Sequence, residues 1–376
     1  MTVAILGAAG TIGRDIARAL AKDRRSEIRL ADARKGAVLA LGRELGVDAA
    51  EVDVNDPNAL RSVLRGCELA VNATWYPSNV SLMEGCLRAD CDYLDLGGLY
   101  HTTLKQIDLD AQFREGGRIA MIGCGKAPGI TNVLAAHGAQ AFDRICAVHL
   151  RSGRRPLEKA SGVRIPYSPA TLLDEFTLRP VVLEDRVLRE VEPLSGREVV
   201  DHGNPFGKLE YVTTLHSELA TLPRNLGRGV ETMSFKVALS AETVAALESL
   251  VHLGFAGREP IQVPGSRVAP RDVAIAVLSR IPAAPGREIW IVEVVLEGRS
   301  RGSRKVATLR VTGDESSNGT ALAAVVVVSL RLDGTIQGTG VHPPETVIPP
   351  GPFLAGLRER GLEVTEVMKI PRGDAH

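Results

Sequence analysis

The chain has 376 residues, of which 44% are hydrophobic and 24% charged, and 45 basic side chains balance 45 acidic ones. This composition predicts a globular protein of two domains, and the zero net charge argues against nucleic-acid binding as its main activity. The longest apolar run, Ala321–Leu330, is too short to span a bilayer, and the five cysteines form no C-x-x-C pair. We therefore expect a cytoplasmic protein with no metal site, no signal peptide and no membrane partner.

The first predicted element is a buried strand at Val3–Leu6, followed by a turn with three glycines and then a helix. This order places backbone N–H groups and the positive end of a helix where a pyrophosphate can bind. The G-x-x-G-x-x-G spacing is one residue longer than the strict dinucleotide fingerprint, so a tight turn without a ligand is the alternative. The residues expected to contact the cofactor here are Gly7, Ala9, Gly10, Thr11 and Ile12, with Gly13 completing the turn.

A second apolar strand, Ile28–Arg34, contains Asp32 at about 20 residues beyond the glycines. An acidic side chain at this place accepts hydrogen bonds from the adenosine ribose and repels a 2′-phosphate, so the sequence favours NAD over NADP. Arg34 and Lys35 follow closely and leave NADP possible. The alternative is that Asp32 only ends a strand.

Strands then alternate with helices, which predicts a Rossmann-type, doubly wound parallel sheet with right-handed crossovers. The expected strands are Ala49–Asp56, Glu68–Thr74, Asp92–Gly98 and Arg118–Gly125, and the expected helices are Pro57–Arg65, Val80–Ala89 and Thr102–Glu115. Ligands bind at the carboxyl ends of such strands. Further cofactor contacts are therefore expected from Asp53, Val54, Ala73, Thr74 and Gly97.

After a helix that starts near Pro128, the pattern changes to strands without regular helical partners, which predicts an inserted α+β domain with a largely antiparallel sheet. Helices are expected at Ala241–Leu253, Arg271–Arg280 and Gly319–Ser329, and proline-bearing loops at 156–169 and 257–270. A last helix begins near Pro350. The predicted domains are 1–127 for the dinucleotide, 128–340 for substrate binding and dimerisation, and 341–376 returning to the first domain.

Four stretches carry a resemblance to a known family. They are the glycine-rich turn, "LAVNATWYPSNVSLMEGCLRADCDYLDLGGLY", "IGCGKAPGITNVLA" and "GTGVHPPETVIPPGPFLAGLRERGLEV". In this order the chain resembles the saccharopine dehydrogenase-like family, and within it the L-lysine 6-dehydrogenase branch. The resemblance implies a homodimer with a nicotinamide cofactor between the two domains. It also implies hydride transfer from an amine-bearing carbon, in that branch the ε-carbon of L-lysine, to NAD, giving an imine that hydrolyses or cyclises.

The chain departs from that branch in two places. The glycine spacing differs from the G-x-G-x-x-G that the family often has. In Val230–Ser240, where the branch commonly carries an arginine beside an aromatic residue, this chain has Ser234 and Phe235, with Lys236 as the nearest cation. A lysine pairs with a carboxylate as a point charge, without the fork of an arginine. Recognition of an α-carboxylate therefore remains open.

His216, Glu218 and Asp95 are the candidate catalytic residues. A neutral histidine is the usual proton acceptor near neutral pH, and Glu218 can orient it or bind a substrate ammonium group. The alternative is a helix N-cap cluster in which Ser217 is the cap. Asp95, at the end of the fifth strand, either accepts a proton or caps the following turn.

The candidate substrate-binding residues are Lys126, Tyr100, Asn132 and Lys236. Lys126 lies at the end of the sixth strand, where it can hold a substrate carboxylate or move protons, and a solvated loop lysine is the alternative. We expect Lys126 and Lys236 to lie in the cleft, with at least one of them on a substrate carboxylate. Asn132 can instead cap the helix that follows.

Three functions remain open from the sequence. The first is an NAD-dependent dehydrogenase of an amine or amino acid, with a small molecule as its partner. The second is an enzyme that joins an amine to a carbonyl reductively with NADPH, as saccharopine and carboxynorspermidine enzymes do. The third is a sensor or scaffold that binds NAD without turnover.

Overall fold

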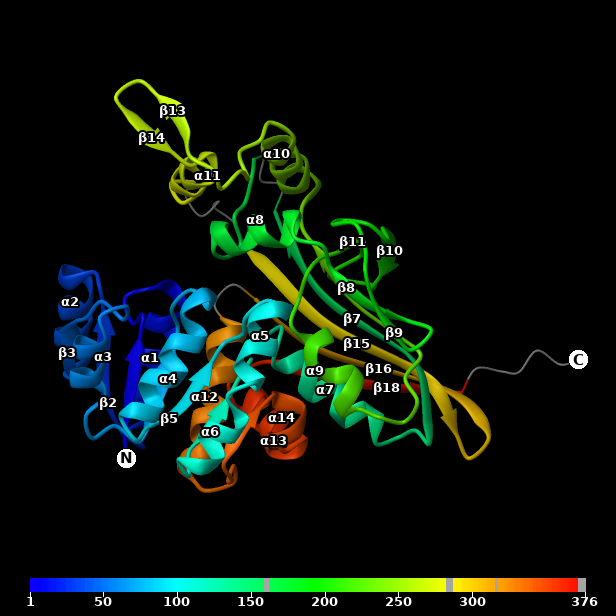
Figure 1. Cartoon of the computed structure of the whole chain (residues 1–376). Helices are drawn as coiled ribbons and strands as arrows, with labels where there is room; N and C mark the ends of the chain where they lie inside the picture. Colours follow the sequence, from blue (N-terminus) through cyan, green and yellow to red (C-terminus); the bar gives the residue numbers. More distant parts are fainter. Residues whose placement is uncertain (159–161, 282–286, 315–316, 371–376) are drawn as a thin grey trace, which may run out of the picture.

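The computed structural model describes residues 1–158, 162–281, 287–314 and 317–370 and contains two large β-sheets (Figure 1). The first sheet has the strand order β17-β6-β5-β4-β1-β2-β3, and all its pairs are parallel. This confirms the predicted Rossmann-type sheet. Its strands are β1 Thr2–Leu6, β2 Glu27–Asp32, β3 Asp48–Glu51, β4 Leu69–Asn72, β5 Asp92–Asp95, β6 Ile119–Met121 and β17 Gly340–His342.

The strand order reverses between β1 and β4, and ligands of such sheets bind at the carboxyl ends of the strands at this point. The helices that connect the strands are α1 Thr11–Asp23, α2 Lys35–Leu45, α3 Pro57–Leu64, α4 Asn79–Arg88, α5 Tyr100–Ile107 and α6 Asp110–Glu115, with the short 3-10 helix η1 at Tyr76–Ser78. The helix expected at Thr102–Glu115 is therefore two helices, because the chain turns at Asp108 and Leu109.

The second sheet is mixed and has nine strands, β10-β11-β12-β7-β15-β16-β18 with β8 and β9 attached to β12. Only β12 and β7 run parallel among the described pairs of this sheet, which confirms the expected α+β character. The strands are β7 Arg144–Pro156, β8 Val181–Glu184, β9 Val187–Glu190, β10 Glu198–Asp201, β11 Lys208–Thr213, β12 Thr232–Ala238, β15 Glu288–Ser300, β16 Ser303–Asp314 and β18 Glu363–Lys369.

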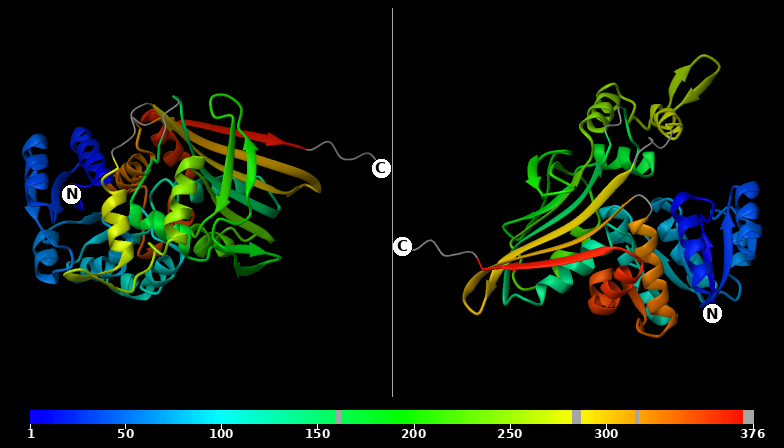
Figure 2. Two further views of the ribbon diagram at one scale, coloured as in Figure 1. Left: turned by 90° about the horizontal axis from the view of Figure 1, so that it is seen from above. Right: turned by 180° about the vertical axis from the view of Figure 1, so that it is seen from behind.

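Helices α7 (Ile130–Ala139) and α9 (Glu218–Asn225) lie between the two sheets, and a separate layer of α8 (Pro169–Thr177), α10 (Ala241–His252) and α11 (Pro270–Leu278) lies at one end of the second sheet (Figures 1 and 2). The loop expected at 257–270 contains a hairpin of β13 (Ile261–Val263) and β14 (Ser266–Val268). Part of the loop expected at 156–169 falls outside the described residues.

The carboxyl-terminal segment contributes to both sheets. Strand β17 pairs with β6 of the first sheet, and β18 pairs with β16 of the second. Between them are α13 (Pro344–Val347) and α14 (Pro350–Glu359), and α14 packs against α7, β18 and α12 (Gly319–Leu332), which in turn packs against α1. The domain boundaries at 127 and 340 and the homodimer stay predictions.

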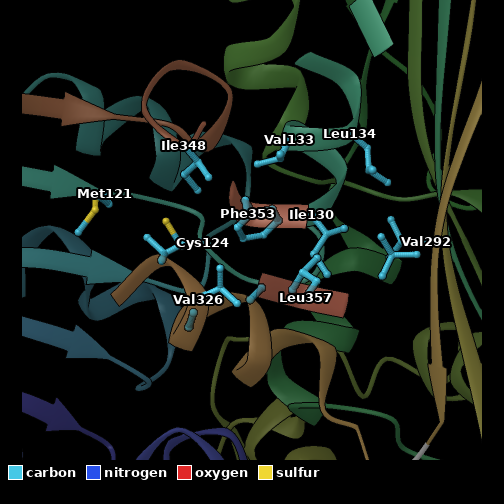
Figure 3. Packing of buried hydrophobic residues seen from close by; sticks show 14 of the residues in the cluster. Met121, Cys124, Ile130, Val133, Leu134, Val292, Val326, Ile348, Phe353 and Leu357 are labelled. Atoms are coloured by element: carbon cyan, nitrogen blue, oxygen red, sulfur yellow. The ribbon is translucent and has the colours of Figure 1, made fainter. Parts of the chain in front are cut away.

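One hydrophobic core connects the two halves of the molecule. It runs from Met121 in β6, through Phe353 in α14, to Val292 in β15 (Figure 3). These side chains are fully buried, so the strand ends of the first sheet are held in place against the second sheet. Among the described residues, no helix combines the length and the apolar character needed to cross a membrane.

Candidate active site

The glycine-rich turn at the end of β1 is shaped to hold a pyrophosphate. Gly7 has a φ of +78°, and a Cβ there would lie 2.8 Å from the carbonyl oxygen of Ala73, while a Cβ on Gly13 would overlap the carbonyl oxygen of Gly7. Helix α1 begins after Gly10 with no side-chain cap and no acidic residue in its first turn. Its N–H groups, including those of Thr11 and Ile12, are therefore placed for an anion.

Asp32 and Arg34 lie beside this turn. The Asp32 carboxylate accepts a 2.9 Å hydrogen bond from Ala9 N–H and a 3.0 Å bond from Arg34 Nε. Burial opposes its ionisation, but these hydrogen bonds outweigh burial and lower the pKa of Asp32. The Arg34 side chain is 60% exposed, and its Nη2 would be 3.7 Å from a Cβ on Gly10. The exposed Arg34 guanidinium thus offers a cation for a 2′-phosphate, whereas both oxygens of the buried Asp32 carboxylate already accept hydrogen bonds from Ala9 and Arg34.

The other predicted cofactor residues lie at strand ends of the same sheet. Ala73 N–H donates to Leu6 between β1 and β4, and Thr74 Oγ1 donates a 2.6 Å bond to Asn72. Gly97 follows β5 with a φ of +125°. Asp53 is exposed and Val54 is partly buried just after β3. Their roles in cofactor binding stay predictions.

Asp95 connects the loops that follow β5 and β6 through hydrogen bonds. Its Oδ1 accepts hydrogen bonds from Gly97 N–H at 2.9 Å and Gly123 N–H at 2.7 Å, and its Oδ2 accepts from Gln106 Nε2 at 2.5 Å and Asn79 Nδ2 at 3.2 Å. The residue is 1% exposed. Burial raises the pKa of Asp95, and the donors around it oppose this. With its oxygens occupied, Asp95 positions the loops after β5 and β6, and its predicted role as a proton acceptor is untested.

His216 and Glu218 form a buried pair at the start of α9. His216 Nδ1 is hydrogen bonded to Glu218 Oε2, and Glu218 Oε1 accepts a 2.7 Å bond from Thr131 Oγ1 of α7. The imidazole stacks on the ring of Phe235 with centroids 3.8 Å apart. Nε2 of His216 has no hydrogen-bond partner in the part of the chain that the structure describes. A carboxylate on Nδ1 fixes the tautomer that leaves Nε2 as the free base.

The structure does not support the alternative in which Ser217 caps this helix. Ser217 occupies the N-cap position of α9, but its side chain makes no capping hydrogen bond, and its Oγ is buried without a partner among the described residues. Burial lowers the pKa of His216, yet the Glu218 carboxylate outweighs burial and the pKa lies above its ordinary value. His216 can therefore accept a proton when it is neutral and donate one when it is protonated.

Lys126 lies on the Trp290 ring, with its Nζ 5.1 Å from the ring centroid. Burial, with a smaller contribution from the Arg154 guanidinium, holds the pKa of Lys126 well below its ordinary value. Arg154 is paired in register with Trp290 across β7 and β15 and donates a 3.0 Å bond to Glu288. Lys126 also acts on the pKa of His216. Two cations thus lie on the same side of the second sheet as the His216 pair.

Sequence reasoning missed Glu175 and Tyr167. Glu175 on α8 is 4% exposed, accepts a 2.6 Å hydrogen bond from Tyr167 Oη, and is coupled electrostatically to His216 and Glu218. Ser168 as the N-cap and Pro169 as the first residue of α8 form a recognisable helix start. No spacing in the sequence, however, indicates that a carboxylate of this helix is coupled to His216.

Of the other predicted substrate residues, Lys236 and Tyr100 make no described contact with this group, and Asn132 contacts it only through Thr131, whose Oγ1 lies 3.3 Å from Asn132 Oδ1. Lys236 follows Phe235 in β12 and so points to the opposite face of the sheet, where its Nζ lies 3.4 Å from Glu198. The expectation that it lies with Lys126 is therefore wrong. Asn132 is buried and occupied, because its Oδ1 accepts from Gly129 N–H and its Nδ2 donates to Glu345 at 2.8 Å. Tyr100 is partly buried at the start of α5, edge-on to His101.

The structure shows no cluster of metal-ligating side chains in the residues that it describes. Two family models match the chain: the saccharopine dehydrogenase NADP binding domain at residues 3–121 and the saccharopine dehydrogenase C-terminal domain at residues 125–362. Carboxyaminopropylagmatine dehydrogenase of Synechocystis sp. is 25% identical over 330 residues, which cover 81% of each chain.

Two solved structures share the fold over nearly the whole chain. Apo saccharopine dehydrogenase (L-Glu forming) of Saccharomyces cerevisiae has a TM-score of 0.78 at 15% identity, covering 98% of this chain and 99% of its own. Homospermidine synthase of Legionella pneumophila, in complex with NAD, has a TM-score of 0.72 at 12% identity, covering 100% of this chain and 94% of its own. The chain therefore belongs to the saccharopine dehydrogenase family and is an oxidoreductase with an NAD(P)-binding first domain.

Proposed function

We propose that this enzyme joins a primary amine to a carbonyl-bearing acid and reduces the imine to a secondary amine, and that it also runs the reverse reaction. The observation that carries the proposal is the His216–Glu218 pair, with Nε2 free, next to Lys126 at the end of the first sheet. The bound nicotinamide would supply or accept the hydride. The glycine turn and the exposed Arg34 guanidinium beside it fit its phosphates.

The chain's own residues can move the protons of this reaction. The amine nitrogen adds to the carbonyl carbon, and the resulting hydroxyl must leave as water, which requires a proton. Protonated His216 can donate that proton from Nε2, while Glu218 stabilises the imidazolium through Nδ1. In the reverse direction, neutral His216 takes a proton from the attacking water. Phe235 and the burial of the pair keep the imidazole in one orientation.

Two basic side chains support recognition of a carboxylate. Lys126 lies over the Trp290 ring, and Arg154, which also pairs with Glu288, is opposite Trp290 in the strand register. A carboxylate in a partly dry site must be paired with a cation to avoid a large desolvation cost. The relative from Synechocystis sp. supports the same chemistry. Its substrate, as the name states, is a derivative of the amine agmatine. This derivative carries a propyl group with one carboxyl and one amino substituent.

The expectation of L-lysine 6-dehydrogenase activity remains the competing proposal. Besides the cofactor, the lysine dehydrogenase reaction needs one organic substrate, whereas the coupling reaction needs two. The resemblance carried by the A-P-G-x-T-N stretch (Ala127–Asn132) supports it, but the named relative supports coupling. The missing arginine beside Phe235 also weakens the case for gripping the lysine carboxylate with a bidentate pair.

A substrate panel separates the two proposals. Reduced cofactor is mixed with amines (L-lysine, 1,4-diaminobutane, agmatine) and carbonyl acids (pyruvate, 2-oxoglutarate, glyoxylate), singly and in pairs, and cofactor oxidation is followed by absorbance. We expect turnover only when both partners are present, and its loss in His216→Gln. In a parallel assay with oxidised cofactor, reduction of NAD by L-lysine alone would instead establish the dehydrogenase of the lysine branch. Oxidation of the reduced cofactor by a carbonyl acid without amine would contradict both.

A further inference from the structure

Helix α8 carries two adjacent buried carboxylates with different surroundings. Asp174 is fully buried and is neutralised by Arg258 at 2.6 Å and Arg271 at 2.9 Å, with a further hydrogen bond from Tyr76 Oη at 2.6 Å. Glu175, the next residue, is also buried but has no ion pair within the described ranges. One carboxylate is thus balanced inside the protein, and the other is not.

The unbalanced carboxylate has one free oxygen. Glu175 Oε2 accepts the hydrogen bond of Tyr167 Oη at 2.6 Å, and Oε1 accepts none from any residue that the structure describes. Burial raises the pKa of Glu175 to about 7, while His216 and Tyr167 oppose the rise and Glu218 adds to it. A buried carboxylate without a cation is costly, and a cationic ligand would remove that cost.

The position of Glu175 indicates which ligand that is. Glu175 is buried on α8 with Oε1 free of any described hydrogen bond, and it is coupled electrostatically to His216 and Glu218, the pair that handles protons in the proposed reaction. The reacting amine nitrogen must be neutral to attack a carbonyl, so a carboxylate beside it would hold it in the wrong protonation state. A second ammonium group on the same molecule has no such conflict and gains a charge-assisted hydrogen bond.

We infer that Glu175 binds a second, non-reacting ammonium group of the amine substrate, so that the enzyme takes diamines or polyamines in preference to monoamines. The inference rests on the proposed function, because it concerns the amine of that reaction. Tyr167 positions the carboxylate through Oε2 and leaves Oε1 for the ligand. The arginines on Asp174 are engaged with that residue and do not compete for Glu175.

Calorimetric titration tests the inference without turnover. The NADP-loaded protein is titrated with 1,4-diaminobutane and with 1-aminobutane, which differ by one ammonium group. We expect the wild type to bind the diamine at least about 10-fold more tightly, the scale of one hydrogen bond to a charged group. In Glu175→Gln this preference should vanish while affinity for the monoamine stays unchanged. Glu184→Gln, at an exposed position in β8, controls for the loss of a charge.

Equal affinity of the wild type for the two amines would overturn the inference, and so would an undiminished preference for the diamine in Glu175→Gln. The first outcome needs no variant, so a variant that fails to fold does not leave the question open. Coupling activity is measured separately. If the wild type shows no coupling activity, the proposed function is refuted. If it shows coupling but binds diamines no more tightly than monoamines, only the role of Glu175 is refuted.

Discussion

Thr131 Oγ1 donates a 2.7 Å hydrogen bond to Glu218 Oε1, and this bond connects the first turn of α7 with the first turn of α9. Both residues are buried. Because Glu218 in turn holds His216 Nδ1, the orientation of the imidazole depends on α7, the next helix after β6 of the first sheet. The two halves of the molecule thus meet in one hydrogen-bonded chain.

Replacement of Thr131 by valine removes this donor and leaves a buried carboxylate oxygen without a partner. We expect kcat to fall by about 10-fold, together with a loss of about 1–3 kcal/mol in the free energy of unfolding. Thr131→Ser keeps the hydroxyl and should restore kcat. Steady-state kinetics and thermal unfolding of the two variants check this, and equal kcat in valine and serine variants would show that the hydroxyl does not position Glu218.

Glu218 raises the pKa of His216, which predicts a pH effect of definite sign. Oxidation of the secondary amine needs neutral His216, so kcat/KM in that direction should rise as the pH increases through the His216 pKa. In Glu218→Gln the carboxylate is gone, the pKa falls, and the rising limb should move to lower pH. Ser217→Ala, which removes a buried hydroxyl without a described partner, is the matched control. If the rising limb of the kcat/KM profile lies at the same pH in Glu218→Gln as in the wild type, His216 is not the titrating group.

A methyl group on Gly13 would overlap the carbonyl oxygen of Gly7 and displace the turn after β1. We therefore expect Gly13→Ala to weaken NAD(P) binding by about 10-fold or more, since the pyrophosphate depends on close approach to this backbone. Gly36→Ala in α2, where nothing lies within 4 Å of the added Cβ, should bind cofactor normally. Fluorescence titration with reduced cofactor measures both, and normal binding by Gly13→Ala would place the dinucleotide elsewhere.

Arg34 is mostly exposed next to Asp32 and the glycine turn. A guanidinium at this position can bind a 2′-phosphate, so Arg34→Ala should reduce affinity for NADP by about 10-fold while leaving affinity for NAD nearly unchanged. Lys35 pairs with Glu51 at 3.1 Å, and Lys35→Ala should change neither. If Arg34→Ala alters the two affinities equally, the side chain has no part in distinguishing the cofactors.

Lys126 is expected to contact the carboxylate of the carbonyl substrate. Lys126→Met keeps the apolar contact with Trp290 and removes the charge. KM for a carbonyl acid should then rise by about 10-fold or more, with little change for an aldehyde that has no carboxylate. Paired kinetics on the two substrates provide the comparison. The same change for both would assign Lys126 to another role, such as proton transfer.

The sequence predicts the first domain well because its signals are local. A glycine turn after an apolar strand, and Asp32 at the end of the next strand, follow from short-range backbone geometry. His216 and Glu218 are two residues apart, so their contact is also local. Strands β17 and β18 were not predicted, because each is stabilised by pairing with a strand far away in the chain.

The remaining site depends on which face of an element meets another. Lys236 is adjacent to Phe235, yet the alternation of side chains along β12 sends the two to opposite faces. Glu175 is coupled electrostatically to His216, although the two residues lie 41 positions apart in the chain, because α8 packs at the end of the second sheet. Asn132 is engaged by Glu345, 213 residues away. No local pattern in the sequence indicates these relationships, because they depend on how distant segments pack.

The most direct test follows the hydride itself. The enzyme is supplied with an amine, a carbonyl acid and reduced cofactor that carries deuterium at the transferable position of the nicotinamide, and the products are analysed by mass spectrometry. We predict a secondary amine that contains the carbons of both substrates and carries the deuterium on the former carbonyl carbon. Deuterium found in a hydroxy acid, or no product joining the two substrates, would contradict the account.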